Sequence, residues 1–225
     1  MDAALAELAD DRWSPEAWAR FLVVSGRRSL ADSRDRPWAL VEGLGLGALL
    51  WARGHRRAGV LVTSMVVTHL GMLEGPDRGL GWANRLTLVR AALPALVPDR
   101  PVVGAATALL TDLADGRVAR RGRPTAFGAY ADSITDLVFW SWFAARHESD
   151  RLWRTACLSL WLAPAVTVTV LYFARGRSVD YPRPFAYRAL AVGCQVAVAL
   201  RAAFREFQCQ PARDPRAVIA SRGVK

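Results

Sequence analysis

The sequence predicts an all-α fold, a multi-pass integral membrane bundle of about six to seven hydrophobic helices. Apolar residues make up 52% of the 225 residues. They gather in seven runs, at about 38–52, 58–75, 86–98, 102–114, 127–145, 152–174 and 185–204. A helix that spans a bilayer needs roughly 20 residues, with a range of about 17–25. By this measure the run at 58–75 and the last three runs are long enough to span.

Residues 1–36 are expected to form an amphipathic helix and a linker outside the bundle. Ser14, Pro15 and Glu16 predict a helix start, because serine caps, proline is tolerated in the first turn and glutamate interacts favourably with the helix dipole. The segment at 26–36 is rich in Arg, Ser and Asp, and we expect a linker there. The first residues are acidic where a secretory signal would be basic, so no cleaved signal is expected.

The remaining runs divide the chain into an additional membrane hairpin over 37–80, a membrane domain over 81–204 and a polar tail over 205–225. The run at 86–98 contains Arg90 and Pro94 and would reach only about 20 Å, so it is expected to be a partial or tilted span. Prolines at 98 and 101 predict a turn after it.

The formal net charge is +10, and almost all of the positive charges are arginines. No nucleic-acid motif or aromatic-studded basic stripe accompanies this charge, so we expect no nucleic acid among the partners. Arginine beside apolar runs instead favours lipid headgroups, or a phosphate carried by a substrate, as the ligand.

Four aspartates on two adjacent runs are the main candidates for a functional site. Asp112 and Asp115 are three residues apart and Asp132 and Asp136 are four apart, so on helices each pair shares one face. Two facing helices would bring the four carboxylates together, and two divalent cations would cancel their charge. Hard oxygen ligands favour magnesium, manganese or calcium over zinc. Aspartates that cap helices or lie in a solvated loop are the alternative.

The residues between the two pairs suit a pyrophosphate ligand. Gly116, Ala119 and Gly128 are small and allow a helix or a substrate to approach the backbone. Four arginines lie among them, at positions 117, 120, 121 and 123. Guanidinium groups next to bound metals are suited to phosphate oxygens, although a basic loop on lipid phosphate is an equal alternative for Arg121 and Arg123.

This stretch resembles the signature of the CDP-alcohol phosphatidyltransferases, DxxDGxxAR followed by GxxxDxxxD. Residues 112–120 read DLADGRVAR and residues 128–136 read GAYADSITD, so every fixed residue type is present. Upstream, Asn84, Thr87 and Arg90 resemble the NxxTxxR opening of the family's first core helix, which extends the resemblance over about 84–204. The loop after Arg120 is one residue shorter than usual. The usual core also has one further helix at its end, a place that the hairpin could fill.

The resemblance implies a membrane enzyme that moves a phosphatidyl group from a CDP-linked lipid, such as CDP-diacylglycerol, to an alcohol and releases CMP. It also implies divalent cations, two Mg²⁺ or Mn²⁺ ions, and Asp136 as the general base. The implied metal ligands are Asp112, Asp115, Asp132 and Asp136. The residues implied to border the CDP moiety are Gly116, Ala119, Arg120 and Gly128. Weaker candidates are Asn84, Thr87 and Arg90.

Two other functions use the same residues. One is a non-catalytic membrane protein that binds or transports divalent cations, or binds CDP-lipid, and the other is a CDP-lipid hydrolase, which needs no alcohol pocket. The expected partners are a CDP-linked lipid, an alcohol acceptor and membrane lipids, with a homodimer as one compatible oligomeric state. The expected location is the cell membrane of a prokaryote.

Overall fold

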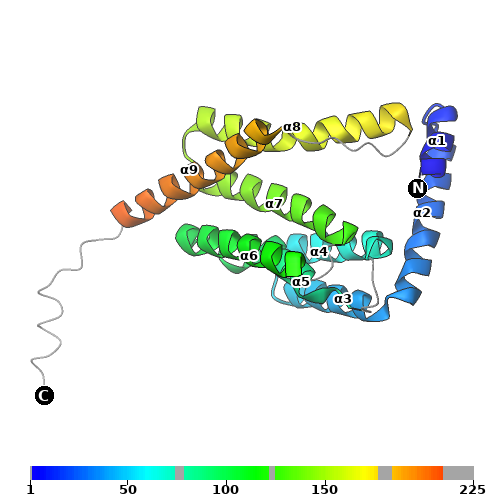
Figure 1. Ribbon diagram of the computed structural model, residues 1–225, viewed down its shortest axis with the longest axis horizontal. Helices are drawn as coiled ribbons and strands as arrows, with labels where there is room; N and C mark the ends of the chain where they lie inside the picture. Colours follow the sequence, from blue (N-terminus) through cyan, green and yellow to red (C-terminus); the bar gives the residue numbers. More distant parts are fainter. Residues whose placement is uncertain (1, 74–78, 122–124, 177–183, 210–225) are drawn as a thin grey trace, which may run out of the picture.

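The computed structural model describes residues 2–73, 79–121, 125–176 and 184–209, and in these ranges the chain is helical and contains no strand (Figure 1). This confirms the all-α class. The helices are α1 (Asp2–Asp10), α2 (Pro15–Asp35), α3 (Pro37–Ala52), α4 (Arg56–His69), the 3-10 helix η1 (Leu70–Met72), α5 (Gly81–Leu96), α6 (Pro101–Arg121), α7 (Ala126–His147), α8 (Arg151–Arg175) and α9 (Phe185–Cys209).

The linker expected over 26–36 is helical instead, because α2 continues to Asp35. Its start agrees with the sequence pattern, since the Ser14 hydroxyl accepts a hydrogen bond from the Ala17 amide at 3.2 Å. Gly26 is the only helix-weakening glycine in this segment, and one glycine costs about 1 kcal/mol relative to alanine. The flanking helix formers and the contacts of α2 with α4 and η1 outweigh that cost.

Helix α2 lies across one end of the bundle, roughly perpendicular to the other long helices (Figure 1). Leu22 and Leu30 are both 63% exposed on it. On its inner side, Gly71 of η1 leaves room for the Asp32 side chain. A helix with this orientation and an exposed apolar surface is typical of a helix that lies in a membrane interface.

Helices α3 and α4 form an antiparallel pair that packs closely through glycine. A Cβ atom on Gly59 would lie only 2.7 Å from the Gly47 carbonyl oxygen, so any larger residue would separate the two helices. The buried residues of this pair share one hydrophobic cluster with Leu88 of α5 and Phe127 of α7. The hairpin therefore packs directly on the helices that carry the aspartates, while the domain boundaries expected from the sequence stay a prediction.

In the part of the chain that the structure describes, α8 and α9 are the two helices long and apolar enough to cross a membrane. Helices α6 and α7 have 21 and 22 residues but carry the charged side chains of the site, which lower their hydropathy. Helices α3, α4 and α5 have only 16, 14 and 16 residues. In particular, the run at 58–75 is interrupted at His69, where α4 ends. Six to seven spans therefore remain a prediction.

A buried carboxylate fixes α9 against the end of α7. Glu148 follows α7 directly, and its side chain is fully buried. Arg201 Nε donates to Glu148 Oε2 at 2.8 Å, and Arg205 Nη1 donates to Oε1 at 3.1 Å. Burial favours the neutral acid, but these hydrogen bonds outweigh it and lower the Glu148 pKa to about 2.

Candidate active site

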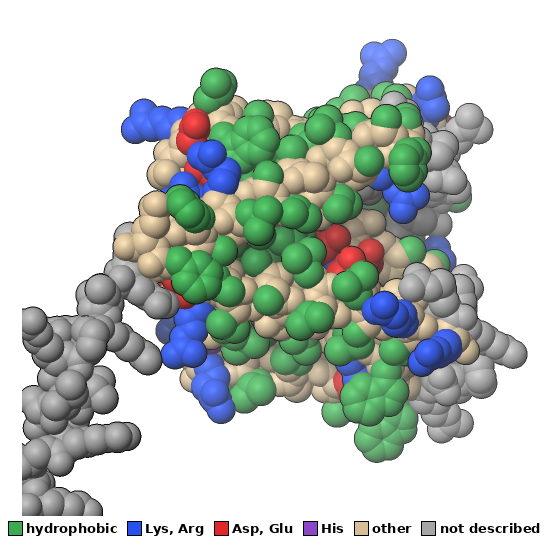
Figure 2. Space-filling model, turned by 60° about the vertical axis from the view of Figure 1, so that its left-hand side comes forward, with side chains coloured by type: hydrophobic (Ala, Val, Ile, Leu, Met, Phe, Trp, Pro, Cys, Tyr) green, Lys and Arg blue, Asp and Glu red, His purple; other side chains and the backbone are tan. Residues whose placement is uncertain are grey.

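Helices α5, α6 and α7 form an open groove. Helix α5 packs along both neighbours, whereas α6 and α7 barely touch each other, so α5 is the floor and the other two are the walls. Figure 2 shows carboxylates gathered in a hollow of the surface with apolar side chains around it. A charged cluster surrounded by an apolar surface suits a ligand that has both a polar and an apolar part.

The four aspartates lie inside helices and do not cap them. Helix α6 continues through Asp112 and Asp115 as far as Arg121. The N-terminus of α7 is capped by Thr125, whose hydroxyl accepts a hydrogen bond from the Gly128 amide at 3.0 Å. The capping alternative is therefore excluded for these aspartates, and each pair projects from one helix face toward the groove.

The Arg90 side chain of α5 lies between the two pairs and is fully buried. Its Nη1 atom is 2.7 Å from Asp132 Oδ1 and 2.5 Å from Asp136 Oδ1. Its Nη2 atom is 2.5 Å from Asp115 Oδ2 and 3.4 Å from Asp112 Oδ1. One guanidinium group thus contacts all four carboxylates, which share one patch of the groove floor.

The donor set fits divalent cations. One arginine against four carboxylates leaves a local charge of about −3, which is costly at low dielectric unless cations compensate it. Asp112, Asp115 and Asp132 each offer a carboxylate oxygen, and these three atoms lie within 4.8 Å of one another. The side chains of Asp112 and Asp132 are 48% and 43% exposed, so a cation can reach them from the groove. Asp136 is not part of this close group of three.

Asn84 and Thr87, the weaker candidates of the sequence, occupy the floor together with Arg90. The Thr87 hydroxyl lies 3.1 Å from both Asp115 Oδ2 and the Ala83 carbonyl oxygen. Asn84 is buried, and its amide donates to the Leu80 carbonyl oxygen at 2.7 Å. A Cβ atom on Gly128 would lie 2.8 Å from Asn84 Oδ1, so this glycine lets α7 approach α5.

The remaining sequence candidates are only partly placed. Gly116 is half-buried on α6, directly after Asp115. Ala119 and Arg120 lie in the last turns of α6, but the structure does not describe their side chains. Arg123 lies outside the described residues altogether. Arg117 is exposed and its guanidinium group turns back toward the Leu113 carbonyl oxygen at 3.4 Å. Contacts between these residues and a pyrophosphate therefore stay a prediction.

Sequence reasoning missed Glu42 of α3, which holds the start of α5. Its Oε2 atom accepts hydrogen bonds from the Leu80 amide at 3.2 Å and from Arg85 Nε at 3.0 Å. Arg85 Nη2 also donates to Oε1 at 2.6 Å. A single carboxylate within an apolar run was the available signal, because such a charge is expensive unless it is paired. Through Glu42 the hairpin positions the helix that carries Arg90.

Comparison with known proteins gives one match. Residues 82–206, more than half of the chain, match the family model described as CDP-alcohol phosphatidyltransferase. The match includes all four aspartates and Arg90, and leaves out α1 to α4. No curated protein and no solved structure matches the chain.

Proposed function

Because the chain belongs to the CDP-alcohol phosphatidyltransferase family, we propose that it transfers the phosphatidyl group of a CDP-linked lipid, such as CDP-diacylglycerol, to an alcohol and releases CMP. The observation that carries this proposal is the meeting of four aspartates around Arg90 in an open groove. Transfer between phosphate esters needs charge neutralisation and a base within reach of the acceptor, and this cluster can supply both.

The metal ligands in this proposal are Asp112, Asp115, Asp132 and Asp136, with Mg²⁺ or Mn²⁺ as the cations. When bound, such cations neutralise a pyrophosphate and stabilise the negative charge on the transferred phosphoryl group. Thr87 and Arg90 hold the Asp115 carboxylate at the floor of the groove, which fixes its position. Side chains fixed in this way lose little freedom when a ligand arrives.

Asp136 is the proposed general base. Its Oδ1 atom is held by Arg90, while Oδ2 has no hydrogen-bond partner among the described residues. The side chain is 30% exposed, so a hydroxyl in the groove can reach it. Asp136 takes the hydroxyl proton, the alcohol oxygen bonds to the lipid-bearing phosphorus, and the bond from that phosphorus to the CMP oxygen breaks. CMP leaves with the bonding electrons, so charge and atoms balance.

The groove also suits the apolar part of the donor. Apolar side chains surround the carboxylates at the surface of the hollow (Figure 2). Acyl chains lying along these side chains would keep the pyrophosphate of the same molecule at the aspartates. A soluble nucleotide substrate would have no use for this exposed apolar flank.

The test is CMP release from CDP-diacylglycerol by the purified full chain, with Mg²⁺ or Mn²⁺ and a panel of alcohols. Asp136→Asn keeps the shape of the side chain and removes the base, so we expect at least a hundredfold loss of turnover. The matched control is Asp99→Asn, at an exposed aspartate that pairs with Arg146 away from the groove.

The products separate the alternatives. A metal-dependent lipid–alcohol product, lost in Asp136→Asn and kept in Asp99→Asn, supports the transferase and names its acceptor. CMP release with no such product for any alcohol would indicate a CDP-lipid hydrolase. Binding of cation and CDP-lipid without CMP release would indicate a non-catalytic protein.

A further inference from the structure

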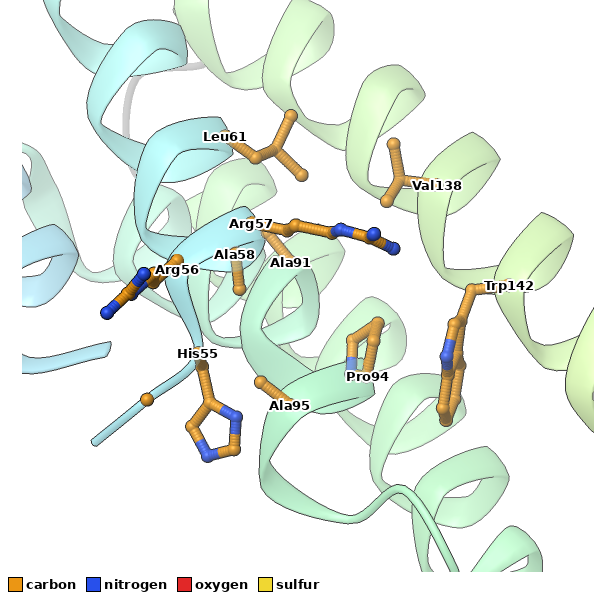
Figure 3. A pocket seen from close by; sticks show the side chains of 11 residues that line it. His55, Arg56, Arg57, Ala58, Leu61, Ala91, Pro94, Ala95, Val138 and Trp142 are labelled. Atoms are coloured by element: carbon orange, nitrogen blue, oxygen red, sulfur yellow. The ribbon is translucent and has the colours of Figure 1, made fainter. Parts of the chain in front are cut away.

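A second hollow lies between the hairpin and the family-matched helices, toward the C-terminal end of α5. Its volume is about 480 Å³, within the range of small-molecule sites. Its lining comes from the start of α4, from α5 and from α7. Val138 and Trp142 face it from α7 (Figure 3). Because successive helical residues are about 100° apart, Val138 lies about 200° around α7 from Asp136, so this cavity is not part of the catalytic groove.

The floor and walls of this cavity are apolar. Small residues of α5, Ala91, Pro94 and Ala95, leave the space open. Leu61 and Val138 lie on opposite sides, and the Trp142 ring closes one end (Figure 3). A surface of this kind accommodates a hydrocarbon chain.

The mouth of the cavity is basic. Arg57 extends from α4 across the opening toward α7, while Arg56 points away and lies 5.8 Å from the Trp51 ring (Figure 3). Arg57 has no ion-pair or hydrogen-bond partner among the described residues, and no carboxylate lines the cavity. The first turn of α4 contains no acidic residue and has no side-chain cap, so the positive end of the helix dipole adds to this charge.

We propose that this cavity binds one anionic glycerophospholipid, with its phosphate at Arg57 and an acyl chain along Leu61, Val138 and Trp142. The combination of an unpaired guanidinium with an apolar interior matches a charged headgroup joined to a hydrocarbon chain. The bound lipid would connect the hairpin, which lies outside residues 82–206, to the core helices α5 and α7. This lipid is a structural ligand and is distinct from the substrate in the groove.

The experiment is native mass spectrometry of the full chain in neutral detergent, titrated with dioleoyl phosphatidylglycerol or dioleoyl phosphatidylcholine. We expect one phosphatidylglycerol to bind at least tenfold more tightly than phosphatidylcholine. Arg57→Gln should weaken this binding about tenfold, which corresponds to about 1.4 kcal/mol. The matched control is Arg53→Gln, at an exposed arginine at the end of α3 that does not line the cavity.

A second variant tests the apolar part independently. Ala95→Trp places a large side chain in the half-buried floor and should abolish binding of phosphatidylglycerol while leaving the helical circular dichroism spectrum unchanged. Equal affinity for the two lipids, or equal weakening by Arg53→Gln and Arg57→Gln, would overturn the proposal. Competition by millimolar inorganic phosphate would also overturn it, because the cavity would then recognise phosphate without a lipid. None of these readouts depends on transferase activity.

Discussion

Removing the Arg90 guanidinium should destabilise the protein more than any change at its surface. Arg90→Met keeps most of the side-chain volume and removes the charge. The structure gives this arginine three hydrogen bonds of 2.5–2.7 Å to carboxylates and no exposure to solvent. Removing one partner of a buried ion pair costs about 3–5 kcal/mol, because the remaining charges are left uncompensated. For a chain of this size each kcal/mol shifts the melting temperature by about 2–4 °C, so we expect a decrease of about 6–20 °C.

The assay is thermal unfolding of the detergent-purified protein in EDTA and again in saturating Mg²⁺. We expect the deficit of Arg90→Met to be smaller in Mg²⁺, since added cations compensate the same carboxylates. The matched control is Arg146→Met, which breaks an exposed pair with Asp99 and should cost about 1 kcal/mol or less. An Arg90→Met protein as stable in EDTA as the native chain would refute the reasoning.

Three further predictions concern Gly128, Asp112 and Glu148. Gly128→Ala places a methyl group 2.8 Å from Asn84 Oδ1, so α7 must move away from α5, and we expect a loss of about 1–3 kcal/mol in thermal unfolding together with reduced turnover. Chelation by EDTA should abolish CMP release, and Asp112→Asn should raise the Mg²⁺ concentration needed to restore it. An unchanged Mg²⁺ requirement in Asp112→Asn would show that this carboxylate is not a metal ligand. Glu148 has its pKa lowered from 4.5 to about 2 by the two α9 arginines against the effect of burial, so its contribution is complete above about pH 4.5 and is lost as the pH falls toward 2. That contribution is at most about 3 kcal/mol, and Glu148→Gln should remove this part of the acid dependence of unfolding.

The sequence predicted the helical placement of the aspartates because their spacing is a local property. Three-residue and four-residue intervals fix a shared face as soon as the segment is helical. The apolar run ends near 114 and did not predict that α6 continues beyond Asp115, because the last turns contain three arginines and a glycine beside valine and alanine. Hydrophobicity therefore located the helices but not their ends.

The contacts of the Arg90 side chain could not be predicted from the sequence. The match of Arg90 to a motif suggested a role, but no spacing could show that one side chain would reach Asp115 and Asp136, 25 and 46 residues away. The contact depends on the packing of α5 between α6 and α7, which is set by Gly128 and by the hold of Glu42 on the start of α5. The linker at 26–36 was wrong for a related reason, since packing on η1 stabilises a segment of weak local preference.

The transverse orientation of α2 affects how deeply the protein would lie in a bilayer. A helix that lies flat at one end of a bundle fixes this depth, because its apolar side chains favour the boundary between headgroups and acyl chains. Since α2 packs on α4 and η1, it is connected through them to α5 and α7, which form the groove. Asp132 and Asp136 lie about two to three turns along α7, or roughly 10–15 Å from its start. Under the proposed function, α2 would therefore set the level at which a lipid phosphate meets the carboxylates, without contributing any atom to the chemistry.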